Sequence, residues 1–231
     1  MVDYLSWRVV LRPGDPRAQD IPGSVLTVGP QFHHESMPDE VGMLLPTNHG
    51  PTRLIDDVVA DPTRCRDAML GLFLANPFLN VTLEGARLRR AGVEWIVNLP
   101  SVAQQDDEFS SQLPDVGLDP DRERDSLARF RDQGFRITAV VADGRDAAAA
   151  AAIQPDAILV LPRVGHFAAG FPSLRQRSSA AQSVAEAVRA ADWTGILLGL
   201  GESRELDSEG LWASHLDGLV CRPSIADAAP G

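Results

Sequence analysis

Four of the five histidines in this 231-residue chain lie a few residues after apolar runs typical of buried strands. They are His33, His34, His49 and His166. An imidazole titrates near neutral pH, so a histidine at the end of a strand can transfer protons to and from a bound molecule. His166 lies near Arg163 and is the best candidate for a general acid or base. The alternative is a solvent-exposed loop histidine.

Other polar side chains follow the same runs. Asn98 lies just before Leu99-Pro100, where its amide could donate to an oxyanion or a carboxylate, or could instead cap the loop. Glu202 follows another run and could move a proton. The predicted catalytic residues are therefore His166, Asn98, Glu202 and His49.

Two arginines also follow apolar runs, Arg163 and Arg222. If they converged, their guanidinium groups could clamp a carboxylate or phosphate, because each can make two parallel hydrogen bonds. The alternative is that they form surface salt bridges with acidic loops. The predicted substrate-binding residues are Arg163, Arg222, Asn76, Ser101 and Ser224.

The stretch 71–118 contains the pattern that would position these residues. The runs 68–75 and 93–99 are nearly all apolar, as expected of parallel strands covered by helices on both faces. Between them lies a predicted helix with Asn80 as its N-cap and Gly92 at its end. Its apolar stripe is expected to comprise Val81, Leu83, Ala86 and Leu88. This is a strand–helix–strand crossover.

Six more strands and five more helices extend the alternation along the chain. The expected strands are 24–29, 40–45, 68–75, 93–99, 135–142, 156–162, 195–201 and 216–221, and the other expected helices are 52–60, 121–133, 145–153, 178–192 and 208–215. Eight strands alternating with helices predict an α/β fold, a (β/α)8 TIM barrel. Helix 1 would be reduced and helix 8 missing or very short. The alternative is an open doubly wound sheet.

The expected domain organisation is an N-terminal extension, 1–23, followed by a single barrel domain, 24–231. The extension contains a candidate extra strand at Ser6–Arg12. Without a full helix 8, an apolar stripe near strands 8 and 1 would be uncovered, so we expect a homodimer.

Three segments carry a family resemblance. They read NPFL at 76–79, VNLPSV at 97–102 and FSSQLPDVGL at 109–118. In sequence and spacing they resemble the phosphoenolpyruvate hydrolase-like family of TIM barrels, which also supplies the barrel domain of a plant tobamovirus-resistance protein. The resemblance implies a lyase or hydrolase that cleaves a C–C or C–heteroatom bond.

This chain departs from the family pattern at acidic positions. Asn76 replaces the family's Asp, and Pro114 and Asp115 replace two Glu. The family's HMGLTTGG segment appears only as LPRVGHFAAG at 161–170. The resemblance therefore implies a divergent member with altered or lost activity.

Composition excludes several classes of function. The chain has no lysine, since all 21 basic residues are arginine, and this excludes Schiff-base, pyridoxal-phosphate and P-loop chemistry in their usual forms. A net charge of −11 argues against nucleic-acid binding. No apolar run approaches 18 residues, so we expect no membrane association and a cytoplasmic location. No organic cofactor is predicted. A divalent metal near His33, His34 and Glu35 is a candidate that would need a further ligand, such as His49, from another loop.

We therefore expect an enzyme acting on a small anionic substrate, a keto acid or an enol ester. The alternative is a non-catalytic barrel that binds a small ligand or a protein partner.

Overall fold

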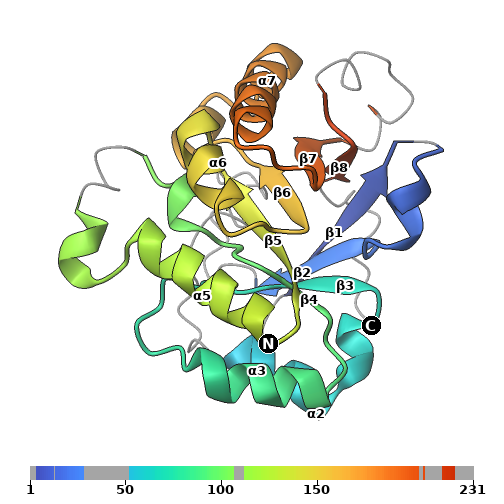
Figure 1. The fold of residues 1–231 in the computed structure, drawn as a ribbon, viewed down its shortest axis with the longest axis vertical. Helices are drawn as coiled ribbons and strands as arrows, with labels where there is room; N and C mark the ends of the chain where they lie inside the picture. Colours follow the sequence, from blue (N-terminus) through green and yellow to red (C-terminus); the bar gives the residue numbers. More distant parts are fainter. Residues whose placement is uncertain are drawn as a thin grey trace.

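A closed barrel of eight strands forms the centre of the protein. The computed structural model describes residues 4–12, 14–28, 52–106, 112–202, 205 and 215–221. Each strand of the barrel pairs with its neighbours in chain order (Figure 1). Strands β2 to β8 run parallel, while β1 runs antiparallel to both β2 and β8. The predicted α/β barrel is confirmed.

Seven of the eight strands begin close to where the sequence predicts but are shorter, whereas the first begins two residues before the expected one and is longer. They are β1 (Tyr4–Leu11), β2 (Ser24–Val28), β3 (Ala68–Gly71), β4 (Trp95–Val97), β5 (Arg136–Val141), β6 (Ala157–Val160), β7 (Ile196–Gly201) and β8 (Gly218–Cys221). The apolar runs extend past the strand ends because loop residues such as Leu72, Leu74 and Leu99 are also buried. The expected strand 40–45 and helix 208–215 fall largely or wholly outside the described residues, as do the connections expected to hold helices 1 and 8.

The N-terminal strand β1 belongs to the barrel, although the sequence placed it in an extension. Trp7 pairs with Val25 of β2, and Arg8 pairs with Cys221 of β8. A boundary after residue 23 therefore does not separate this strand from the barrel. The connection from β1 to β2 holds only the short 3-10 helix η1 (Pro16–Gln19), and such short connections suit antiparallel pairs.

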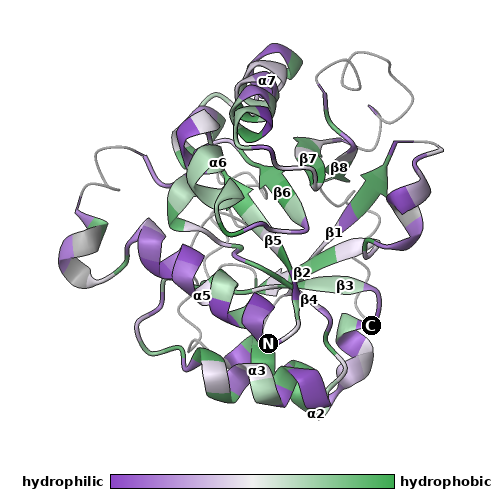
Figure 2. Cartoon of the chain, in the orientation of Figure 1, coloured by the Kyte–Doolittle hydropathy of each residue, from purple (hydrophilic) through white to green (hydrophobic). Residues whose placement is uncertain are grey.

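In the described part of the chain, five helices lie outside the barrel, and Figure 1 shows their arrangement. They are α2 (Arg53–Ala60), α3 (Val81–Arg90), α5 (Pro120–Asp132), α6 (Gly144–Ala151) and α7 (Leu174–Ala190). One apolar cluster fills the barrel interior, with members from every strand, and a second lies between the barrel and the helices. The strands are accordingly the most hydrophobic elements in Figure 2.

Two helices differ from the prediction in detail. In α3 the expected apolar residue Leu83 is 54% exposed, and the buried positions are Val81, Glu84, Gly85 and Leu88. A Cβ at Gly85 would contact the amide end of the Gln133 side chain, which would have to shift to make room. Helix α7 begins four residues before the expected start.

The cap of α7 explains its earlier start. The hydroxyl of Ser173 accepts from the backbone N–H of Gln176, and the Gln176 side chain accepts from the N–H of Ser173. This reciprocal capping box satisfies two backbone donors that would otherwise lack partners.

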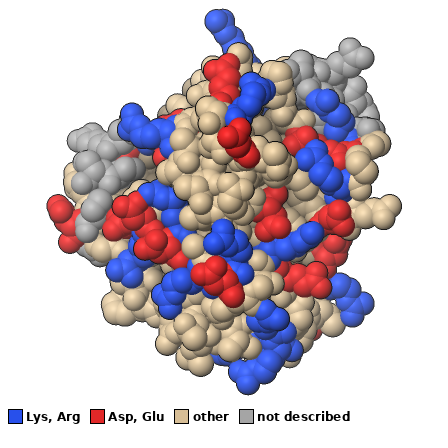
Figure 3. Space-filling model, viewed as in Figure 1, with Lys and Arg blue, Asp and Glu red and all other residues tan. Residues whose placement is uncertain are grey.

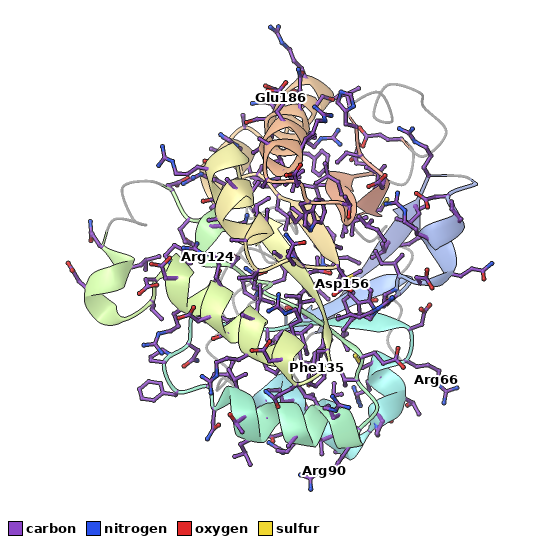
Figure 4. The ribbon with its side chains drawn as sticks, in the orientation of Figure 1. Arg66, Arg90, Arg124, Phe135, Asp156 and Glu186 are labelled. Atoms are coloured by element: carbon purple, nitrogen blue, oxygen red, sulfur yellow. The ribbon has the colours of Figure 1, made fainter. Side chains whose placement is uncertain are left out.

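Three aspartates make the same kind of hydrogen bond to the backbone where parallel strands begin. Asp67, Asp156 and Asp217 each immediately precede a strand, β3, β6 and β8. Their carboxylates accept from the backbone N–H of Gly23, Ile137 and Leu197 at 3.1, 2.9 and 2.8 Å. Each bond joins a strand start to the strand preceding it in the sheet, so these residues fix the N-terminal rim of the barrel. Asp156 lies among the strand starts in Figure 4.

Acidic and basic side chains are interspersed over the face shown in Figure 3. Among the described residues, no helix is both long and apolar enough to cross a membrane.

Candidate functional site

The loop that follows β4 is anchored by a buried carboxyl group. Glu123, in the first turns of α5, accepts hydrogen bonds from the Ser101 hydroxyl at 2.6 Å, the Asn98 amide at 3.1 Å and the Val102 N–H at 3.1 Å. The Asn98 carbonyl oxygen accepts from Val140 N–H of β5 at 2.7 Å. These contacts join β4, β5 and α5 at the C-terminal end of the strands.

Burial changes the acidity of this carboxyl. Glu123 is 2% exposed, and desolvation raises its pKa to about 7 despite the hydrogen bonds from Ser101, Val102 and Asn98, which lower it. The negative charge of Asp146 raises it further. Glu123 can therefore hold or release a proton near neutral pH. Its neighbours in sequence are charged, and only its spacing from Leu127 and Phe130 marks it as buried, so sequence reasoning missed it.

The same loop crosses the end of β5 and is bonded to the loop after β6. The Gln104 amide donates to the Leu161 carbonyl at 3.2 Å, and Arg163 donates to the Gln105 carbonyl at 3.3 Å. The Asp106 carboxylate then accepts from Gly165 N–H at 3.0 Å. We call residues 101–106 the crossing loop. It brings the ends of β4, β5 and β6 together.

Three charged side chains, Arg163, Asp143 and Asp146, lie beside this loop. Arg163 donates to Asp143 at 3.0 Å and lies 3.9 Å from Asp146. Burial pushes the pKa of Asp143 up, but hydrogen bonds from the Asp146 N–H and from Arg163 outweigh it and lower the pKa. The pKa of Asp146 is raised, first by burial and then by the charge of Asp143. Arg163 is thus held among carboxylates, and its side chain is 21% exposed.

The structure brings together only some of the predicted site residues. Asn98 and Ser101 meet at Glu123, and Arg163 reaches the same loop through Gln105. The Asn98 amide nitrogen donates to Ser101 and Glu123, and its oxygen accepts from Val140 of β5.

The other predicted residues lie apart or are not described. His166 is exposed on the 3-10 helix η5 (Val164–Phe167). The Asn76 side chain accepts from Phe78 N–H within a turn. Glu202 is 5% exposed, and its N–H donates to Glu205, which pairs with Arg177. His49, Arg222 and Ser224 lie outside the described residues, as do His33, His34 and Glu35.

Two other features could mark a site, a group of metal ligands and a surface cavity. The described residues contain no group of three or more His, Cys, Asp or Glu side chains placed to hold a metal ion. Two surface cavities of about 520 and 550 Å³ lie at the opposite end, near the starts of β3 and β4 and of β7 and β8. Barrel chemistry is typical of the C-terminal rim, so we place the candidate site at the crossing loop.

Comparison with known proteins supports the fold. No family model and no curated protein sequence matches the chain. The structure of the phosphodiesterase PaMucR in complex with c-di-GMP is similar, with a TM-score of 0.52 and 12% identity over 95% of this chain and 93% of that one. At this identity the likeness concerns the barrel fold alone.

Two further structures have weaker similarity. A FabK mutant from Thermotoga maritima has a TM-score of 0.42 and 11% identity over 71% of this chain and 48% of that one. Nitroalkane oxidase from Streptomyces ansochromogenes has a TM-score of 0.36 and 16% identity over 77% and 46%. The chain thus spans about half the length of each.

Proposed function

We propose that this barrel is an enzyme that acts on a small anionic substrate at the crossing loop. The reaction would be that of a lyase or hydrolase cleaving a C–C or C–heteroatom bond in a keto acid or enol ester, as the resemblance to the phosphoenolpyruvate hydrolase-like family implies. The observation that carries the proposal is the gathering of Arg163, Asp143, Asp146 and Glu123 where β4, β5 and β6 end, with two raised carboxyl pKa values. Clusters of this kind are typical of functional sites.

Each charged group has a part in this proposal. Arg163 would bind a substrate carboxylate in place of, or together with, Asp143, because a guanidinium can donate to two acceptors at once. Asp146 is half-buried and Glu123 is enclosed, so Asp146 is the nearer carboxyl for proton transfer. Glu123 would keep the crossing loop in position through Ser101 and Val102.

Binding of small dicarboxylates tests the proposal. We expect succinate and 2-oxoglutarate to raise the melting temperature of the wild type, and Arg163→Ala to weaken their binding about 10- to 100-fold, because charge-assisted hydrogen bonds are lost. Arg66→Ala is the matched control, since Arg66 is an exposed arginine near the opposite rim, where it projects outward in Figure 4. Equal stabilisation of Arg163→Ala and the wild type would count against the clamp.

A second candidate is a non-catalytic barrel that binds a ligand or a protein. The specific observation in its favour is that Asn98 and Asn76 both use their side chains to hold loops. This candidate predicts ligand binding with no turnover of keto acids or enol esters, whereas the enzyme proposal predicts product formation that Asp146→Asn abolishes.

The proposed homodimer also stays a prediction. On β8 the side chains of Leu219 and Cys221, which belong to the outer apolar cluster, are fully buried within a single chain. Light scattering of the purified protein would measure the mass directly, and a monomer would refute the dimer.

A further inference from the structure

Two fully buried side chains each carry a polar atom without a hydrogen-bond partner. Among the described residues, these atoms are Oε1 of Gln104 and Nε1 of Trp7, and both side chains have 0% exposure. Leaving such an atom unpaired is unfavourable, because it loses its hydrogen bonds to water and gains none in the folded protein. Native proteins therefore usually satisfy these groups with protein, water or a ligand.

The orientation of the Gln104 amide follows from its other contact. Its nitrogen donates to the Leu161 carbonyl at 3.2 Å, and a carbonyl can only accept. The amide cannot be turned over without losing this bond, so Gln104 presents an acceptor that is unused. Leu161 belongs to the apolar cluster of the barrel interior, directly after β6. The free oxygen is therefore at the end of the barrel where ligands bind in this fold.

The surroundings hold Gln104 in place. Ser101 is bonded to Glu123, Gln105 to Arg163, and Asp106 to Gly165, so contacts on both sides fix the crossing loop. A side chain fixed in this way is suited to recognition, since little freedom is lost on binding.

Trp7 offers the complementary group. On β1 it alternates with Leu5, Val9 and Leu11, and all four side chains pack in the cluster inside the barrel. Its indole N–H is a donor only. Because this cluster fills the interior, a ligand would meet Trp7 at the C-terminal rim, where the next residue, Arg8, pairs with Cys221, the last residue of β8. A small molecule that bears both a donor and an acceptor could therefore satisfy both atoms.

We infer that Gln104 determines substrate specificity, its Oε1 accepting a hydrogen bond from a hydroxyl group of the substrate while Trp7 donates to one of the substrate's oxygens. This inference rests on the proposed function. It narrows the class of possible substrates, because the substrate must carry a hydroxyl group in addition to its carboxylate. A keto acid with only acceptor oxygens would leave Gln104 unpaired.

Matched pairs of compounds test this inference. The probes are 2-hydroxyglutarate against 2-oxoglutarate and lactate against pyruvate, with binding measured by calorimetry. In the wild type we expect the hydroxy acid to bind about tenfold more tightly than the oxo acid, since one hydrogen bond is gained and a buried acceptor is satisfied. Gln104→Met keeps the size of the side chain and should abolish this preference. Trp7→Phe should weaken both members of a pair about three- to tenfold.

The control variant is Gln182→Met, because Gln182 is exposed on α7 and bonds only to Glu186. It should retain the preference for the hydroxy acid. The wild-type preference is measured without any variant, so a misfolded Gln104→Met protein would leave the test intact.

The outcomes separate this inference from the proposed function. Equal binding of the two members of each pair in the wild type would overturn the role of Gln104 but leave an anionic substrate in place. Binding of the neutral hydroxy methyl esters without binding of the acids would support the role of Gln104 and overturn the anionic substrate. No binding of any probe would overturn both. A crystal structure in which Gln104 Oε1 accepts from another part of the chain would overturn the inference alone.

Discussion

The Ser101 hydroxyl donates a 2.6 Å hydrogen bond to the Glu123 carboxyl group and so joins the loop after β4 to helix α5. Both side chains are almost completely buried, at 1% and 2% exposure. The position of the crossing loop therefore depends on a titratable group enclosed by protein.

This arrangement predicts that stability falls as the pH rises. The folded-state pKa of Glu123 is raised from 4.5 to about 7, chiefly by burial. Its contribution is fully present below pH 4.5 and is lost as the pH rises through about 7, because the unfolded chain releases the proton first. The change in free energy of unfolding is of order 3 kcal/mol at most, since one pKa unit corresponds to about 1.4 kcal/mol.

Urea unfolding of the wild type and of Glu123→Gln from pH 5 to pH 8.5 would measure this effect. The variant side chain stays neutral, so its stability should change less over that range. Asp115→Asn is the control, because Asp115 is exposed. Parallel pH profiles for the wild type and Glu123→Gln would contradict the prediction.

The aspartates at the strand starts predict a second effect on stability. Asp156→Ala removes the acceptor of the Ile137 N–H at the start of β5. We expect a loss of about 1.5–3 kcal/mol in the free energy of unfolding, the usual value for a hydrogen bond to a charged group. Asp132→Ala should have little effect, because the Asp132 side chain is 69% exposed. If both variants lost the same free energy of unfolding, the hydrogen bond from the Ile137 N–H to Asp156 would contribute nothing to stability.

Hydrophobic patterning was enough to predict the barrel and most of its helices. Runs such as 68–75 are apolar because the strand is covered on both faces, and this signal is strong. It does not show where a strand ends, because Leu72 and Leu74 are buried in the following loop. Nor does it give strand direction, so β1 was recognised as a candidate strand but not as part of the barrel.

The candidate site was harder to predict from the sequence. Asn98, Ser101 and Arg163 were identified because polar residues at strand ends are conspicuous. Glu123 was missed because it lies on a helix within a charged segment, and its burial depends on contacts with the distant residues Asn98 and Ser101. The start of α7 was placed four residues too late, although Ser173 and Gln176 have the spacing of a capping box and could have marked it.

A buried ion pair near the end of β7 gives the last prediction. Arg177, in the first turn of α7, bonds both oxygens of Glu205 at 2.5 and 3.0 Å and also the carbonyls of Pro172 and Leu200. Its side chain is only 5% exposed. Glu205→Ala would leave this guanidinium buried without its carboxylate, so we expect a loss of about 3–5 kcal/mol in the free energy of unfolding.

Two comparisons test this reasoning. Asp121→Ala removes the partner of Arg124, but Asp121 is 80% exposed, so this loss should stay below about 1 kcal/mol. The double variant Arg177→Met/Glu205→Leu removes both charges and should be less destabilised than Glu205→Ala alone, because no buried charge is left unpaired. If the double variant were the less stable of the two, the cost would lie in lost packing and carbonyl contacts rather than in an uncompensated charge.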